Sequence, residues 1–421
     1  MLTPAYAPTA TERVLPRLAL DFTTASLDAR VTVTRALNTA TRVNSSGFIA
    51  GVNANLPRFD YDPITLACKG LLIEESRANA FTYSQDFGNA IWVRSITNVS
   101  TDVAVSPDGT TNADSLIPTT ATGNHSIRQP ASLTNGVVYT MSGFFKANGY
   151  RRVMLRESTA FGYAAVFDLI SGTVVGTSSA TGTITNFGNG WYRCQMTFTS
   201  EWTNTSDMNI FVMPDNGTSY ATASFTGDGT SNILAYGAQL EAGAFPTSYI
   251  PTTTTSVTRN ADVVSMTGTN FSSWYNASEG TFVATSSTIN LAASRPIFQT
   301  STAGVVNGGQ FVYYDPAGSR ISIRDYDSGG SAVGVISYTG AGTPAVNTNY
   351  CMAFAYKTNS FAAAANGNAV AQDTTGTVSG TPDALYIGRD TAATYLNGYV
   401  RKINFYTMRL TNAEVQSFSK G

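Results

Sequence analysis

The fold class is decided by the stretch Gly190-Trp191-Tyr192-Arg193-Cys194-Gln195-Met196-Thr197-Phe198. From Tyr192 to Phe198 its apolar residues fall at every second position, which is the period of a β-strand with one buried face. A second stretch, Met208-Asn209-Ile210-Phe211-Val212-Met213, has the same period. Both stretches predict strands of an antiparallel sheet with a buried core on one side.

Further strands are expected on both sides of these two. They recur at intervals of about 10–15 residues with Gly and Asn between them, a spacing typical of a sandwich or jelly roll. Those expected before residue 250 are 137–147, 152–156, 164–169 and 232–241, and those after it are 280–285, 311–314, 320–324, 350–356, 385–388 and 398–406. The best helix candidate is Thr411–Phe418, where Thr411 and Glu414 have the spacing of a capping box.

Composition supports an all-β chain. Only 12% of the 421 residues are charged, whereas 11% are aromatic and 37 are glycine. Exposed helices need many Lys and Glu residues on their wet face, and strands favour the Thr, Val, Tyr and Phe that are plentiful here. The net charge of −2 gives no basic stripe for nucleic acid, and one histidine excludes a cluster of histidine metal ligands.

Polar linkers and turn signals divide the chain into four segments. We expect an N-terminal arm and segment over residues 1–79, a jelly roll over 80–250, a linker over 251–256 and a second sandwich over 257–421. The fold class is therefore two tandem antiparallel β-sandwich domains after a short N-terminal segment. The linker is assigned to Pro251-Thr252-Thr253-Thr254-Thr255-Ser256, a polar run that begins with proline.

The sequence contains few features that indicate a cellular location. Cys68, Cys194 and Cys351 are far apart and odd in number, so we expect three buried thiols and synthesis in a reducing cytoplasm. The first twenty residues lack the pattern of a signal peptide, and no apolar run approaches 18 residues. We therefore expect neither ordinary secretion nor membrane insertion.

Three parts of the chain resemble segments of tailed-phage virion proteins. The N-terminal part resembles their N-terminal region, the middle part is similar to their carbohydrate-binding jelly rolls, and the last part is similar to laminin-G or concanavalin-like lectin sandwiches. Ala78 and Ala80 depart from the first pattern, where Thr and Leu are commoner. The matching residues are Phe22, 26–30, 57–63, 69–74, Arg77, Asn79, 83–87 and 89–92; then 106–110, 113–114, 139–142, 167–169, Gly172, 189–193 and 237–241; then 279–281, 386–389, 397–403 and 410–418.

The resemblance implies a protein on the surface of a phage particle, made in the host cytoplasm. Its N-terminal segment would dock to other virion proteins, and the chain would form a homo-oligomer, with a trimer favoured. The stretch from Arg58 to Asn79 is interpreted as the joint between docking segment and jelly roll, and 237–252 as the end of the jelly roll. Recognition loops are expected away from both.

Catalytic patterns are missing from the sequence: there is no GxSxG, HExxH or P-loop. His125 has no partners in a recognisable context and is expected to be structural. The carboxylate pairs Asp60/Asp62 and Glu74/Glu75 are expected in turns or interfaces, because adjacent strand residues point to opposite faces. We expect no enzyme; a polysaccharide-degrading tailspike is the weakest of three hypotheses, since no solenoid repeat is present.

Sugar sites combine an aromatic ring with a few planar polar groups. Trp202, in a polar stretch that predicts a loop, is the preferred exposed aromatic residue. Trp92 and Trp191 are expected in the core. Further candidates are Tyr150, Tyr163, Trp274 and Tyr275, although burial is the default for each.

Cofactors and metals are not expected. The loops Asp215-Asn216-Gly217 and Gly227-Asp228-Gly229 offer oxygen atoms to Ca²⁺, and related jelly rolls often carry a structural calcium. Neither loop matches an EF-hand, and both fit plain turns. No metal ligand is assigned.

The preferred hypothesis is a non-enzymatic tail-fibre or spike adhesin that binds host surface polysaccharide. The alternative is a head fibre or capsid decoration protein with weak glycan binding or none. The two would carry the same modules, so the sequence leaves both open.

Overall fold

The computed structural model describes residues 15–158, 162–301, 309–327, 331–378 and 380–421. It is 52% strand and 4% helix, which confirms the all-β prediction. Two compact units are present: one consists mainly of residues 33–263, and the other of residues 264–421 together with residues before 23 and 26–32. The N-terminal arm expected over the first residues lies, up to residue 14, outside the described part.

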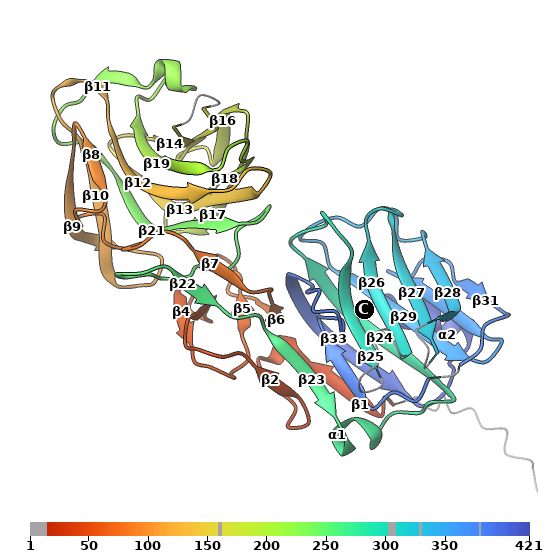
Figure 1. The fold of residues 1–421 in the computed structure, drawn as a ribbon. Helices are drawn as coiled ribbons and strands as arrows, with labels where there is room; N and C mark the ends of the chain where they lie inside the picture. The colour runs from red at the N-terminus through yellow and green to blue at the C-terminus, as the bar shows by residue number, and fades with distance from the viewer. Residues whose placement is uncertain (1–14, 159–161, 302–308, 328–330, 379) are drawn as a thin grey trace, which may run out of the picture. The chain divides into compact units, whose positions relative to one another are not determined.

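The unit of residues 33–263 contains a jelly roll of two six-stranded sheets (Figure 1). Neighbouring strands are antiparallel wherever their register is defined. The first sheet runs in the order β17 (Thr181–Gly188), β18 (Trp191–Thr199), β13 (Val138–Asn148), β21 (Asn232–Ala242), β10 (Thr111–Pro118), β9 (Thr97–Val105). The second runs β16 (Thr173–Ser178), β15 (Ala164–Asp168), β14 (Arg152–Glu157), β19 (Asn204–Met213), β12 (Ser126–Leu133), β8 (Val93–Ser95).

The core lies between these sheets because both turn their apolar positions inward. Cys194 and Met196 of β18 meet Met208, Ile210 and Val212 of β19 in one buried cluster. The alternation that predicted these strands is thus the alternation of core and outer face.

Each sheet also carries an apolar cluster on its outer face. On the first sheet, Phe144, Trp191 and Tyr236 are covered by Ile49 and Tyr249. On the second, a cluster containing Met154, Phe211 and Met213 packs with Ala223, which follows the short 3-10 helix η2 (Tyr220–Thr222). A separate short pair is formed by β11 (Thr122–Asn124) and β20 (Ser224–Thr226).

Residues 33–79 belong to the same compact unit as the jelly roll. They form two hairpins and one strand that pairs with the chain leaving the jelly roll. These elements are β3 (Ala40–Val43) with β4 (Ile49–Val52), β5 (Phe59–Tyr61) with β6 (Cys68–Ile73), and β7 (Arg77–Asn79) with β22 (Val257–Arg259).

The segment expected as a linker, residues 251–256, also lies inside this unit. The backbone N–H groups of Tyr83 and Ser84 donate to the carbonyl oxygens of Thr253 and Thr252 at 2.6 and 3.3 Å. Thr252 is buried. The compact units therefore part at residue 263, beyond the expected linker.

The second unit is a sandwich of residues 264–421 with one N-terminal strand. β1 (Leu18–Asp21) pairs antiparallel with β33, so part of the expected N-terminal segment completes this sandwich. One sheet contains, in order, β31 (Ala371–Asp373), β30 (Phe361–Ala365), β29 (Tyr350–Lys357), β24 (Glu279–Thr288) and β33 (Gly398–Tyr406). The other contains β23 (Val263–Thr267), β32 (Ala384–Ile387), β25 (Arg295–Ser301), β26 (Gly309–Asp315), β27 (Arg320–Tyr326) and β28 (Ala332–Tyr338).

Two helices belong to this unit: α1 (Thr269–Ser272) and α2 (Asn412–Phe418). The capping box expected at α2 is confirmed, since the Thr411 side chain accepts from the Glu414 N–H and the Glu414 carboxylate accepts from the Thr411 N–H. Val415 of α2 packs into an alanine-rich cluster with β29 and β30. At the points where the chain passes between the units lie η1 (Phe22–Thr24), β2 (Thr32–Thr34) and β23.

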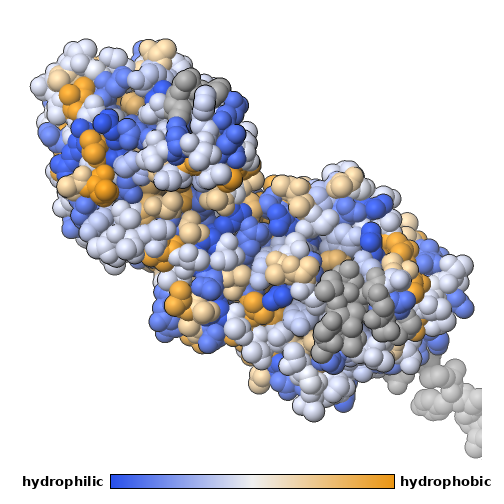
Figure 2. Space-filling view, viewed as in Figure 1, coloured by the Kyte–Doolittle hydropathy of each residue, from blue (hydrophilic) through white to orange (hydrophobic). Residues whose placement is uncertain are grey.

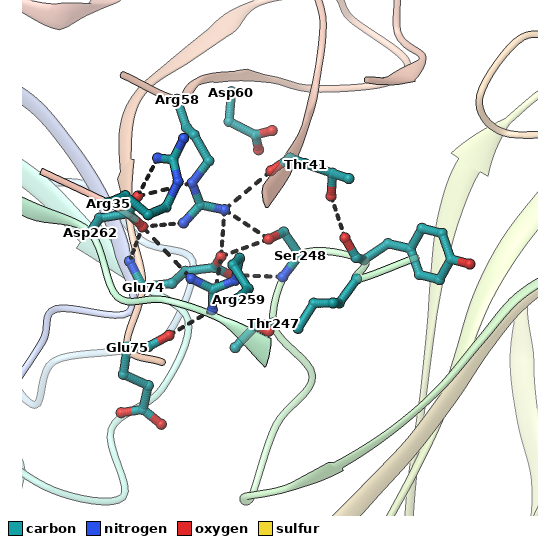
Figure 3. Close-up of polar contacts among 12 residues, drawn as sticks. Arg35, Thr41, Arg58, Asp60, Glu74, Glu75, Thr247, Ser248, Arg259 and Asp262 are labelled. Carbon is teal, nitrogen blue, oxygen red and sulfur yellow. Dashed lines mark hydrogen bonds and ion pairs between the residues drawn. The ribbon is translucent and has the colours of Figure 1, made fainter. Parts of the chain in front are cut away.

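A buried ionic cluster ties the two ends of the jelly-roll unit together (Figure 3). Arg58 donates through Nη1 to Glu74 Oε2 at 2.7 Å and through Nε to Asp262 Oδ1 at 3.2 Å, and its Nη2 also meets Asp262. Arg35 Nη1 donates to Asp262 Oδ1 at 2.8 Å, and Arg259 Nη2 lies 3.5 Å from Glu74 Oε2. All five side chains are buried.

The cluster holds the Glu74 carboxylate in the ionised form. Burial alone would raise the pKa of Glu74, but Arg259 and Arg58 outweigh it and lower the pKa to about 2. Ser248 adds hydrogen bonds from its N–H and hydroxyl to the same carboxylate, both at 2.8 Å. Because Arg58 bonds both acids, its loss would leave two buried carboxylates short of a partner.

Arg58→Ala is therefore expected to destabilise the unit of residues 33–263 by about 3–5 kcal/mol, the usual result of removing one partner from a buried ionic pair. Arg94→Ala is the control, because Arg94 is exposed and surface substitutions change stability by roughly 0.5 kcal/mol or less. Urea unfolding followed by tryptophan fluorescence measures both. Equal midpoints for the two variants would contradict a structural role of the cluster.

Candidate functional site

The exposed aromatic residue predicted from the sequence is Trp202, in the loop between β18 and β19. Its side chain is 52% exposed. The loop backbone is well anchored: the Ser200 hydroxyl donates to the Trp202 carbonyl oxygen at 2.8 Å, and the Asn135 N–H donates to Thr203 Oγ1 at 3.0 Å. A ring exposed on an anchored loop can stack on a sugar with little loss of chain entropy.

The Trp202 loop lies at the beginning of β13, because the Ser200 N–H donates to the carbonyl oxygen of Val137 at 2.9 Å. The next residue, Val138, accepts from the N–H of Gly243 at 2.7 Å. The loop is therefore close to the end of β21, whereas the sequence placed recognition loops away from that stretch.

Tyr150 lies at the other end of β13 and is half-buried. Its ring meets Phe225 edge-on with centroids 5.2 Å apart, and burial raises the pKa of its hydroxyl. Eleven strand residues separate the two ends, which is roughly 35 Å at the rise of a β-strand. Tyr150 and Trp202 therefore cannot line one monosaccharide site.

The prediction that Tyr163 binds sugar is wrong. The residue is 4% exposed and its ring stacks on Phe198 with centroids 4.8 Å apart, inside the core. The sequence around Tyr163 did not reveal that its ring packs on Phe198, which lies in another strand.

Trp274 is also a wrong assignment, and Tyr275 is placed in the same core. Trp274 is 2% exposed, and its indole N–H donates to the Asn270 carbonyl at 2.9 Å. Tyr275 is half-buried, and its ring stacks on Phe271 at 4.6 Å and on Phe405 at 5.6 Å. These rings close one end of the C-terminal sandwich instead of facing a ligand. The core placement expected for Trp92 and Trp191 is confirmed.

One concavity was missed by sequence reasoning. A cavity of about 180 Å³ opens where the β3–β4 turn meets the first jelly-roll sheet. Aromatic residues Phe48, Phe187 and Trp191 line it, and Lys146 and Asn189 lie at its edge. It is smaller than the roughly 300 Å³ at the lower end of small-molecule sites. Phe48 was missed as a cavity residue because the β3–β4 hairpin that carries it is far in sequence from the sheet that it meets.

The residues considered for catalysis have structural partners. Asp60 accepts the Val43 N–H at 2.6 Å, Asp62 accepts two N–H groups of its own turn, and Glu74 belongs to the ionic cluster. His125 is buried, with Nδ1 2.6 Å from the Ile96 carbonyl oxygen and Nε2 3.1 Å from that of Phe225. This geometry anchors the β11–β20 pair next to the jelly roll.

The loops considered for calcium are turns stabilised within the chain. Asp228 Oδ1 accepts the N–H groups of Thr230 and Ser231 at 2.8 and 2.7 Å, and Asp215 Oδ1 accepts that of Arg151 at 3.2 Å. Within the described ranges, His, Cys, Asp and Glu side chains nowhere gather in a group of three that could hold a metal. Cys194 and Cys351 are buried as expected, whereas Cys68 is half-buried.

The visible surface carries apolar residues in separate patches among polar ones (Figure 2). Exposed apolar side chains include Ile64, Leu66, Val103 and Val105 in the jelly-roll unit. None of the helices in the described ranges has the length and apolar character that a bilayer span requires.

A buried polar cluster in the C-terminal sandwich contains an unusual acid. Asp325 is fully buried, and Gln310 Nε2 donates to its Oδ2 at 3.2 Å. Gln310 Oε1 in turn accepts from Tyr275 and Thr300. Burial raises the pKa of Asp325 to about 7, because no cation compensates within the described residues.

Comparisons with known proteins give distant structural similarity only. No family model and no curated protein sequence matches the chain. The chain is similar to NanB sialidase from Streptococcus pneumoniae (16% identity, TM-score 0.30, 36% of this chain and 26% of that one). It is also similar to the CBM40 of the Ruminococcus gnavus IT-sialidase bound to α2,3 sialyllactose (16%, 0.30, 36% and 86%).

A third similar structure is that of botulinum neurotoxin type C, described as interacting with two ganglioside molecules (10% identity, TM-score 0.29, 38% of this chain and 40% of that one). The chain thus spans about a quarter of the NanB chain and less than half of the toxin chain. No family assignment follows from these similarities.

Asp325→Asn is expected to change the pH dependence of the C-terminal sandwich. The unfolded carboxyl releases its proton near pH 3.8 and the folded one near pH 7, so stability falls as pH rises between these values. The wild type should lose on the order of 2–4 kcal/mol across this range, and the variant should lose less.

Thermal unfolding at pH 4.5 and pH 7.5 measures this difference. Asp327→Asn, in the same hairpin, is the control and should keep the wild-type slope. A wild-type slope in Asp325→Asn would show that the buried carboxyl does not titrate in this range.

Proposed function

We propose that this chain is a non-enzymatic structural protein of a tailed-phage particle, of the tail-fibre or spike type, that binds host surface glycans. The observation that carries the proposal is the exposed ring of Trp202 on the anchored β18–β19 loop. An aromatic face among polar residues is what a sugar ring with one apolar face requires. The resemblance of the N-terminal and jelly-roll segments to virion proteins supports the location on a particle.

The two-sandwich architecture supports binding rather than catalysis. The carboxylates considered for glycan hydrolysis are engaged in turns or in the ionic cluster, and the low pKa of Glu74 is the reverse of what a general acid needs. In this proposal the N-terminal residues dock to other virion proteins, and the sandwich modules carry the recognition loops.

Trp202→Ala is expected to weaken binding to a glycan ligand roughly tenfold, because one stacking interaction is lost. Trp202→Phe should retain part of the affinity. Ile170→Ala is the matched control, since Ile170 is a large apolar residue of the same jelly roll that is 63% exposed. The measurements are a bacterial glycan array followed by calorimetry on the best ligand.

Three outcomes would reject parts of the proposal. A blank array, together with capsid-lattice positions in electron micrographs of the particle, would favour a head fibre or decoration protein. Soluble oligosaccharide released from host envelope would make the protein an enzyme. Unchanged affinity in Trp202→Ala would move the site away from this loop.

The resemblance to phage virion proteins favours a homotrimer of the purified chain, in which repeated weak sites would gain avidity. Native mass spectrometry at micromolar concentration should give three times the chain mass of 44.5 kDa. A species of single-chain mass at that concentration would exclude the trimer.

A further inference from the structure

A polar row crosses the outer face of the second jelly-roll sheet. Arg128 of β12 and Arg156 of β14 both pair in register with Asn209 of β19, from opposite sides. Residues directly opposite in an antiparallel sheet point to the same face. The three side chains therefore form one row, on the face opposite to the core residues Met208 and Ile210.

Arg156 is held in place without a counter-ion. Its guanidinium carbon lies 3.9 Å from the centroid of the Tyr220 ring, and Nη1 donates to Ser158 Oγ at 3.1 Å. Among the residues that the structure describes, Arg156 makes no ion pair, and its buried Nε has no hydrogen-bond partner. A positioned guanidinium with free donors is suited to a planar anion.

The rest of the row leaves an excess of positive charge. Arg128 Nε lies 3.1 Å from Asp207 Oδ2, and both side chains are 40% exposed. One carboxylate thus stands beside two arginines, which gives this patch a local charge of +1 on a chain of net charge −2. An anionic ligand is therefore attracted more strongly to this patch than to the remainder of the surface.

Tyr220 adds an aromatic ring beside this row. Tyr220 is 45% exposed; the Arg156 guanidinium lies over its ring, and Phe211 meets the ring in a T-shaped contact with centroids 5.8 Å apart, so part of the ring stays accessible to a ligand. Asn209 is buried, and its Nδ2 donates to Ser158 Oγ at 2.7 Å, which holds this hydroxyl beside Arg156. A half-exposed phenol ring and two guanidinium groups therefore lie on one surface.

We propose that this face binds a carboxylate-bearing sugar unit of an acidic polysaccharide. The sugar carboxylate accepts hydrogen bonds from Arg156 with Arg128 beside it, and the ring lies against Tyr220. The inference rests on the proposed function and deepens it, because it names the glycan class. The site is separate from the Trp202 loop, since its polar groups lie on the sheet.

The test compares polygalacturonate with its carboxyl-reduced form, by calorimetry on the full chain. We expect the acidic polymer to bind at least tenfold more tightly, with the preference shrinking as salt is raised from 50 to 500 mM. Arg156→Gln should abolish the preference, and Arg156→Lys should restore it only in part, because the planar fork is lost. Arg94→Gln, which removes an exposed arginine of the same module, should behave as the wild type.

Each alternative result has a distinct meaning. Equal binding of both polymers, or an acidic preference that survives in Arg156→Gln, overturns this inference while leaving glycan binding through Trp202 intact. Binding of sulfated dextran as tight as that of polygalacturonate, with the same dependence on Arg156, would replace the carboxylate by a general anion and also overturns it. If neither polymer binds and a neutral glycan array is blank, the proposed function fails as well.

Discussion

The arrangement of the jelly-roll unit depends on the buried contact of Arg58 with Glu74 and Asp262. It joins residues 204 positions apart, one before the jelly roll and one after it. Asn79 completes the closure: its amide donates to the carbonyl oxygens of Ala238 and Ile250 at 3.1 and 2.9 Å. Buried ion pairs are weak evidence for stability but fix geometry, because a displaced partner leaves a charge without compensation. Three residues of the N-terminal stretch singled out from the sequence, Arg58, Glu74 and Asn79, thus help to close the module.

This closure decides which jelly-roll surfaces remain available to a ligand. Arg58 also donates to the carbonyl oxygen of Thr41 at 3.1 Å, which fixes the β3–β4 hairpin. Ile49 of that hairpin then covers the outer face of the first sheet, apart from the small cavity beside Phe48. The outer face of the second sheet is covered only in part, by the segment around Ala223. The loops and the second sheet are therefore the jelly-roll surfaces that remain open.

The strands could be predicted because burial of one face places an apolar residue at every second position, and this pattern is visible within a short stretch of sequence. The capping box of α2 was predictable for the same reason, as both partners lie within four residues. Tyr163 and Trp274 were misassigned because the sequence around each does not reveal its core partner far along the chain, Phe198 for Tyr163 and Phe405 for Trp274. The arginine row was missed since Arg156 and Asn209 are 53 positions apart and meet only through strand register.

The arginine row stands out because charged residues are scarce in this chain. In a chain with only 12% charged residues, most arginines of the jelly-roll unit are tied to carboxylates: Arg58 to Asp262, Arg77 to Glu75, and Arg151 to Asp168. Arg156 lies over the Tyr220 ring instead, and it makes no ion pair with the residues that the structure describes. The ring and the Ser158 hydroxyl offset part of the cost of half-burying this cation. The ligand proposed above, an anion borne on a sugar ring, would supply the remaining compensation.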